Sequence, residues 1–178
     1  MDFYGFYTGK EFEAYRFLGA HACEKGTVFR TFAPNAQRIS LIGEFNDWQE
    51  TPMQKVHDGN FWECYAENAQ KGMMYKYKIY GADGSCIQNI SIDHCDPYGF
   101  YAVLRPNSAS IIYDTTNYHF TDGEWMKKRS IHRQAPLNIY EVHFGSWRKK
   151  TNDDPEGWYT YREMADLLIP YLNENGYN

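Results

Sequence analysis

The sequence has little positive charge and no long apolar run. Its 178 residues carry 18 basic against 23 acidic side chains, for a formal net charge of −5. Nucleic-acid binding calls for a basic stripe, and the one local basic run is Arg148-Lys149-Lys150. No stretch reaches the roughly 18 apolar residues of a membrane span. We therefore expect neither nucleic acid nor a membrane as a partner.

A secretion signal and paired cysteines are also missing. The N-terminal stretch MDFYGFY lacks the basic start and the apolar run of a signal peptide, which predicts a cytoplasmic protein. The four cysteines are Cys23, Cys64, Cys86 and Cys95. Their spacing forms no C-x-x-C pattern, so we expect free thiols and no zinc, and no other motif indicates a cofactor.

Aromatic residues, in contrast, are abundant: they make up 18% of the chain, with 16 Tyr, 11 Phe and 5 Trp. Two interpretations stay open. Aromatic side chains favour strands, which indicates a β-rich core. They also form exposed surfaces that stack on flat partners such as sugar rings or bases.

Short β-type runs separated by turn residues fill the first two-thirds of the chain. The expected strands are 28–32, 39–42, 61–66, 74–80, 87–92, 101–104 and 110–113. Their number and regular turns predict a mainly β fold, an immunoglobulin-like sandwich. A short helix is expected before it, over 8–21, with Gly19 as its end. We place this first domain at 1–115.

Two motifs in this domain are more specific. FAPNA at 32–36 is followed by LIGEFNDW at 41–48, and then by DGNFWE at 58–63 and YKYKI at 75–79. In this order they resemble the starch- and glycogen-binding module attached to enzymes of the alpha-amylase superfamily. DPYG at 96–99 and RPNSAS at 105–110 resemble the branching-enzyme members of that family.

The resemblance implies a glucan-binding site at Trp48, Lys76 and Asn46. Trp48 lies in a polar turn with Asn46, and packing in the core does not readily explain an indole at such a position. A sugar-binding site needs an aromatic platform with a few polar groups that fix orientation. Lys76 alternates with two tyrosines and should point to the opposite face. Trp62 is expected to pack in the core. Glycogen-targeting family members carry a second Trp near 85–88, and this chain has none there.

The last third, 116–178, predicts a different kind of domain. A polar connector at 117–131, anchored by Phe120, Trp125 and Met126, precedes an apolar strand at 136–144. An amphipathic helix is expected over 161–175, with Thr160 and Glu163 as a capping box, Pro170 as a kink or interruption and Gly176 as the stop. Strand then helix is the first unit of a truncated (β/α)8 barrel.

IYEVHFGSWR at 139–148, with YTYRE at 159–163, closely resembles the barrel entry of bacterial 1,4-alpha-glucan (glycogen) branching enzymes. This family moves α-1,4-glucan segments to 6-hydroxyls and forms α-1,6 branches. The resemblance implies an Asp nucleophile, a Glu acid/base and a second Asp on later barrel strands. None has a matching position in this sequence, so we expect no catalytic residue here and a chain that is inactive alone.

Two groups of ionisable residues in this region have weaker catalytic interpretations. Glu141 and His143 would share one face of the strand, but a structural role is favoured for both. We expect the carboxylates at 153, 154 and 156 to lie in a polar loop, exposed to solvent.

Three functions remain open. The first is the N-terminal part of a glycogen branching enzyme, whose partners are glycogen and amylose-like α-glucan chains. The second is a stand-alone glycogen-binding module, and the third is part of a debranching or trehalose-releasing enzyme. The apolar residues of the barrel fragment predict either a frayed region or self-association that covers it.

Overall fold

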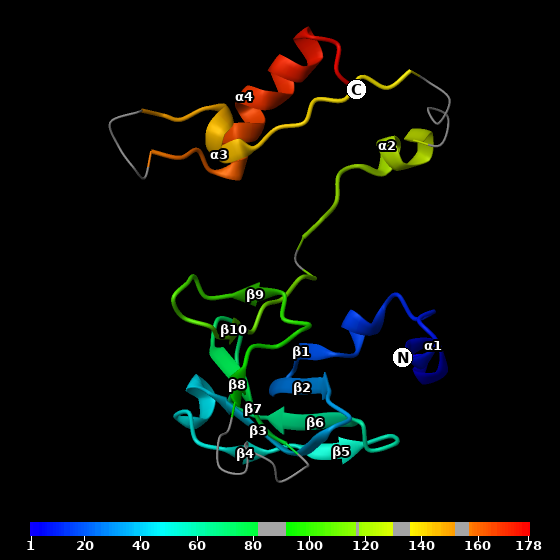
Figure 1. Ribbon diagram of the computed structural model, residues 1–178, viewed down its shortest axis with the longest axis vertical. Coiled ribbons are helices and arrows are strands. Elements are labelled where there is room, and N and C mark those ends of the chain that lie inside the picture. The colour runs from blue at the N-terminus through cyan, green and yellow to red at the C-terminus, as the bar shows by residue number, and fades with distance from the viewer. Residues whose placement is uncertain (82–91, 117, 130–135, 152–156) are drawn as a thin grey trace. The chain divides into compact units, whose positions relative to one another are not determined.

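The chain divides into two compact units, Met1–His119 and Phe120–Asn178. The computed structural model describes residues 1–81, 92–116, 118–129, 136–151 and 157–178. Figure 1 shows the helices and strands of each unit.

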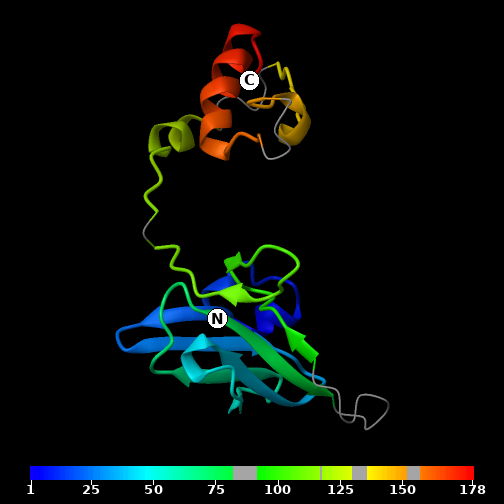
Figure 2. The same ribbon diagram turned by 90° about the vertical axis from the view of Figure 1, so that its left-hand side faces the viewer.

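Two antiparallel sheets form the first unit (Figures 1 and 2). The four-stranded sheet has the order β1-β2-β6-β5, with β1 at Gly19–Cys23, β2 at Gly26–Phe32, β5 at Gln54–Val56 and β6 at Phe61–Ala66. The six-stranded sheet has the order β4-β3-β7-β10-β9, with β8 also paired to β7. Its strands are β3 at Ala36–Gly43, β4 at Thr51–Pro52, β7 at Met74–Gly81, β8 at Ile92–His94, β9 at Tyr101–Ala102 and β10 at Ser110–Ile111.

The core lies between these sheets. Phe29 and Trp62 come from the four-stranded sheet, and Leu41, Tyr75 and Tyr77 come from the six-stranded one. Side chains along a strand alternate between its faces, so each sheet gives one face to a shared apolar layer. This arrangement confirms the predicted β-sandwich and the core position of Trp62, whose indole N–H donates to the carbonyl of Ala33 at 3.0 Å.

The helix expected over 8–21 is wrong. A single 3-10 turn at Ala14–Arg16 is followed, two residues later, by β1. Gly19, expected to end a helix, adopts φ +102° and begins the strand, opposite Arg30 of β2. A helix this short depends on tertiary packing, and the hairpin with β2 satisfies the backbone instead. The strand expected at 87–92 lies outside the described residues except for its last position.

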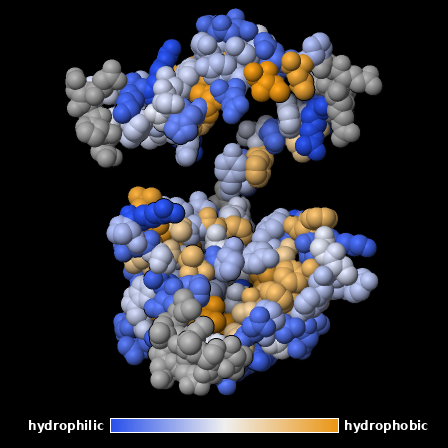
Figure 3. Space-filling model, in the orientation of Figure 1, coloured by the Kyte–Doolittle hydropathy of each residue, from blue (hydrophilic) through white to orange (hydrophobic). Residues whose placement is uncertain are grey.

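A short helix, α1 (Phe3–Tyr7), covers one end of the four-stranded sheet. The carboxylate of Asp2 accepts a hydrogen bond from the N–H of Gly5 at 3.0 Å and caps it. Phe3 and Phe6 then pack edge-to-face on Phe61. Figure 3 shows hydrophobic residues gathered over this part of the unit.

The second unit contains three helices in its described residues: α2 (Gly123–Lys128), α3 (Phe144–Trp147) and α4 (Tyr161–Glu174). The expected capping box of α4 is confirmed. The N–H of Thr160 donates to Glu163 Oε2 at 2.8 Å, and the N–H of Glu163 donates to Thr160 Oγ1 at 3.4 Å. Gly176 ends the helical segment with φ +71°. Of the two expected effects of Pro170, a kink or an interruption, the interruption does not occur, because α4 runs through Pro170.

The predicted barrel strand does not form. Residues 136–143 have no regular secondary structure, and 144–147 are helical. A strand needs a neighbour to take its backbone hydrogen bonds, and no strand is present in the described part of this unit. Asn138 instead exchanges hydrogen bonds with Asn178: its N–H donates to Asn178 Oδ1 at 2.9 Å, and its carbonyl accepts from the N–H of Asn178 at 3.2 Å.

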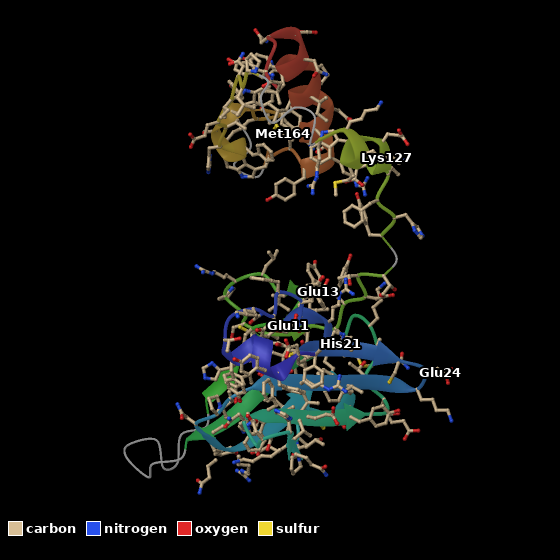
Figure 4. The ribbon with its side chains drawn as sticks, turned by 90° about the vertical axis from the view of Figure 1, so that its right-hand side faces the viewer. Glu11, Glu13, His21, Glu24, Lys127 and Met164 are labelled. Atoms are coloured by element: carbon tan, nitrogen blue, oxygen red, sulfur yellow. The ribbon has the colours of Figure 1, made fainter. Side chains whose placement is uncertain are left out.

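The connector also departs from expectation. It contains α2, and its three expected anchors are exposed: Phe120 by 78%, Trp125 by 61% and Met126 by 46%. The interior of this unit is formed around α4, where Met164, labelled in Figure 4, and Leu168 are buried. Among the helices described, none is long and apolar enough to cross a membrane.

Candidate functional site

A pocket of about 470 Å³ opens on the outer face of the six-stranded sheet. It is lined by Ile42, Trp48, Met74, Lys76, Asp93, Pro106, Asn107, Ser108 and Ala109. Ile42 and Lys76 are directly opposite each other on β3 and β7. Their neighbours Leu41, Tyr75 and Tyr77 are fully buried in the core, so this face points away from it.

Trp48 reaches the pocket from a tight loop after β3. A 3-10 turn at Glu44–Asn46 is followed by two residues in the left-handed region, Asp47 at φ 52° and Trp48 at φ 58°. The N–H of Trp48 donates to the carbonyl of Gly43 at 2.8 Å, which closes the loop. A left-handed conformation costs a non-glycine residue about 1–2 kcal/mol. The loop adopts this conformation and leaves the indole 41% exposed, so the strained backbone holds the ring toward solvent instead of burying it.

Asn46 occupies a different place from the predicted one. It does not line the pocket, and its side chain is engaged within the loop. Its Nδ2 donates to the carbonyl of Leu41 at 3.2 Å and to Thr51 Oγ1 at 2.9 Å, while its Oδ1 accepts from the N–H of Gly43 at 2.9 Å. Both amide hydrogens are therefore used. Asn46 shapes the loop that carries Trp48.

Glu50 anchors the other end of this loop to the sheet. Its carboxylate accepts hydrogen bonds from Tyr80 Oη at 2.7 Å and Ser40 Oγ at 2.9 Å. The ammonium of Lys78 lies 3.4 Å from the carboxylate, and the Arg38 guanidinium lies 3.7 Å from it. These contacts, led by the hydrogen bond from Tyr80, lower the pKa of Glu50. No motif pointed to Glu50, although it lies two positions after Trp48.

Lys76 enters the pocket as predicted, from the face of β7 opposite its two tyrosines. Its Nζ donates to Ser108 Oγ at 3.2 Å. Ser108, Asn107 and Pro106 lie between β9 and β10. These residues belong to the RPNSAS motif at 105–110, whose residues had no predicted role, because nothing local in the sequence places that segment beside Lys76.

The arrangement suits an uncharged ligand that is rich in hydroxyl groups. The pocket offers one indole face, one ammonium, one carboxylate, a side-chain amide and a hydroxyl. An aromatic platform with a few polar groups that fix orientation is typical of small-ligand sites. Metal binding has no comparable support: in the ranges that the structure describes, no three His, Cys, Asp or Glu side chains group to hold an ion.

A buried carboxylate supports the sheet beneath the pocket. Asp96 is 6% exposed, and its Oδ2 accepts hydrogen bonds from Tyr75 Oη at 2.7 Å and Tyr77 Oη at 3.1 Å. Its N–H donates to Ser110 Oγ at 2.8 Å. Burial raises the pKa of Asp96, and the tyrosine hydrogen bonds oppose that shift. With its hydrogen bonds directed into the core, Asp96 is a structural acid.

The second unit gives little support to local catalysis. Glu141 and His143 are exposed and do not lie on a strand, so the expected shared strand face is absent. His143 contacts its own helix end, with Nδ1 3.2 Å from Ser146 Oγ. The carboxylates at 153, 154 and 156 lie outside the described residues.

Comparison with known proteins supports the carbohydrate interpretation. Residues 17–99 match carbohydrate-binding module 48 (isoamylase N-terminal domain). The 1,4-alpha-glucan branching enzyme GlgB of Bacillus caldolyticus is 41% identical over 99% of this chain, and that of Rubrobacter xylanophilus is 40% identical over 99%. The chain spans about a quarter of these relatives, 27% and 24% of their lengths.

A solved structure agrees with the fold. The putative alpha amylase of Salmonella typhimurium aligns with 90% of this chain at a TM-score of 0.60 and 21% identity, over 23% of its own length. Residues 17–99 thus match carbohydrate-binding module 48, and nearly the whole chain is similar to the N-terminal part of GlgB-type 1,4-alpha-glucan branching enzymes.

Proposed function

We propose that the pocket at Trp48 and Lys76 binds an α-glucan chain, as found in glycogen and amylose. The observation that carries this proposal is the half-exposed indole of Trp48, held in the pocket wall together with Lys76. The apolar face of a glucose ring would stack on the indole. The ammonium of Lys76 and the hydroxyl of Ser108 would then bond to hydroxyls at the edge of the ring.

We infer further that the complete protein is a branching enzyme, which moves α-1,4-glucan segments to 6-hydroxyls and creates α-1,6 branches. The support is the similarity to GlgB enzymes over 99% of the chain. The match includes the second unit as well as the module, which favours this function over a stand-alone binding module. Retaining transfer needs two carboxyl groups about 5 Å apart, and no residue of this sequence matches the family's catalytic carboxylates. The 178-residue chain would therefore bind or orient glucan and leave transfer to other residues.

Native affinity electrophoresis in gels with soluble glycogen tests the binding. Glycogen should retard the chain, and Trp48→Ala should remove most of that retardation. Trp158→Ala is the matched control, because Trp158 is 42% exposed, close to the 41% of Trp48, but lies in the second unit. Equal retardation of the Trp48→Ala variant and the unchanged chain would reject the site.

The iodine absorbance of amylose tests the expected lack of transfer. Incubation with the 178-residue chain should leave this absorbance unchanged. A reproducible fall would show that the chain carries catalytic groups of its own.

A further inference from the structure

The pocket wall contains two charged side chains, Lys76 and Asp93. Lys76 bonds to the hydroxyl of Ser108 rather than to an acid. Asp93 is exposed, and its carboxylate forms no hydrogen bond or ion pair with any residue that the structure describes. The pocket thus presents one positive and one negative group that do not neutralise each other by direct contact.

The register of the sheet explains why Asp93 is left unpaired. Asp93 on β8 lies directly opposite Lys78 on β7, the usual position for a cross-strand ion pair. Lys78 is instead drawn toward Glu50, with its ammonium 3.4 Å from that carboxylate. Glu50, at the end of the loop that carries Trp48, therefore binds the ammonium that would otherwise pair with Asp93.

We infer that Asp93 is a specificity-determining residue that makes the pocket select uncharged glucan over glucan carrying phosphate monoesters. The inference rests on the proposed glucan binding and adds a charge criterion to it. Sugar hydroxyls can donate hydrogen bonds to a carboxylate, so Asp93 tolerates a neutral ring. A phosphate monoester carries a charge of about −1.5 to −2 at pH 7 and offers mainly acceptor oxygens. Asp93 repels such a group and offsets the attraction of Lys76.

The size of this effect follows from Coulomb's law. Two unit charges about 6 Å apart, at an effective dielectric constant of roughly 40–80, change a binding constant by roughly three- to tenfold. Salt weakens the interaction because both groups are reached by solvent. The discrimination should therefore be clearest at low ionic strength.

Isothermal titration calorimetry with maltoheptaose, and with maltoheptaose phosphorylated at one 6-position, tests the inference. The unchanged chain should bind the neutral sugar more tightly. Asp93→Asn should raise the affinity for the phosphorylated sugar relative to the neutral one by roughly three- to tenfold, and added salt should shrink this change. Glu24→Gln is the matched control, since it removes one negative charge from the exposed turn between β1 and β2 (Figure 4).

The outcomes separate the two proposals. If the unchanged chain fails to bind maltoheptaose, the proposed function falls, and the charge criterion falls with it. If maltoheptaose binds but Asp93→Asn leaves the ratio of the two affinities unchanged, glucan binding stands and the role of Asp93 is rejected. An equal shift in Glu24→Gln would also reject it, because net charge would explain the result. Should Asp93→Asn lower the melting temperature, Asp93→Ser repeats the test with a smaller polar side chain.

Discussion

Tyr80 donates a 2.7 Å hydrogen bond to the carboxylate of Glu50, and this bond links β7 to the loop that carries Trp48. Ser40 on β3 bonds to the same carboxylate at 2.9 Å. The loop is thus fixed to both central strands of the sheet, two residues beyond the indole. Positions far from any sugar contact should therefore affect binding.

Glu50→Ala should weaken glycogen binding without removing a pocket residue. The variant loses the hydrogen bonds from Tyr80 and Ser40, and we expect a loss of about 1 kcal/mol of stability from urea denaturation. Tyr80→Phe removes one of the bonds and should give a smaller loss of the same kind. If affinity electrophoresis finds Glu50→Ala bound as tightly as the unchanged chain, the loop holds its shape without this anchor.

Asn46→Ala should lower the stability of the first unit while it leaves the residues that line the pocket in place. Three hydrogen bonds of the side chain disappear, two of them to backbone groups. Leaving such groups unsatisfied costs about 1–3 kcal/mol. Chemical denaturation measures this loss, and a retardation assay on the folded variant measures the effect on Trp48. A variant of full stability with reduced binding would instead indicate direct contact of Asn46 with glucan.

Asp96→Asn tests the buried acid through its pH dependence. Burial raises the pKa of Asp96 in the folded chain, so the folded state holds its proton to a higher pH than the unfolded state does. Its contribution to stability is present below the unfolded pKa of about 3.9 and falls as pH rises through the folded pKa. The stability of the unchanged chain, measured relative to Asp96→Asn, should therefore fall as the pH rises from about 3.9 through the folded pKa. A constant difference would show that Asp96 titrates as it does in the unfolded chain.

Glu163→Gln tests a group whose contribution to stability depends on pH in the opposite direction. The ammonium of Lys150 and the capping contacts with Thr160 lower the pKa of Glu163 to about 2. Its contribution is present above the unfolded pKa, near 4.3, and is lost as pH falls toward about 2. Helix content of the unchanged chain, followed by circular dichroism, should decline over this range more than that of Glu163→Gln. Identical acid profiles would mean that the capping box survives protonation.

The sandwich could be predicted from the sequence because its signals are local. Alternation around Tyr75 and Tyr77 identified both the strand and the outward direction of Lys76. The helix expected before Gly19 failed because pairing with β2, a contact between separate segments, decides the conformation there. The strand expected at 136–144 failed for the related reason that a strand needs a partner, which apolar residues alone do not supply.

The site was predictable only in part. Trp48 and Lys76 could be identified from motifs, and the structure brings both into one pocket. Asn46, in the same motif, does not line the pocket and bonds within the loop instead, because the motif does not reveal which polar groups face inward. Asp93 and Ser108 join the pocket through the pairing of β8, β7 and β10, which no local pattern encodes.

The left-handed conformation of Asp47 and Trp48 has a thermodynamic consequence for recognition. The turn is closed by hydrogen bonds that need no ligand, so the platform is ready before a sugar arrives, and the protein loses little conformational entropy when one binds. In the proposed glucan-binding mode, a single indole would make each encounter weak, and a bound chain would leave readily. A branched polymer offers many chain ends at once, and rapid rebinding among them can keep the protein on its surface while each end stays free to move.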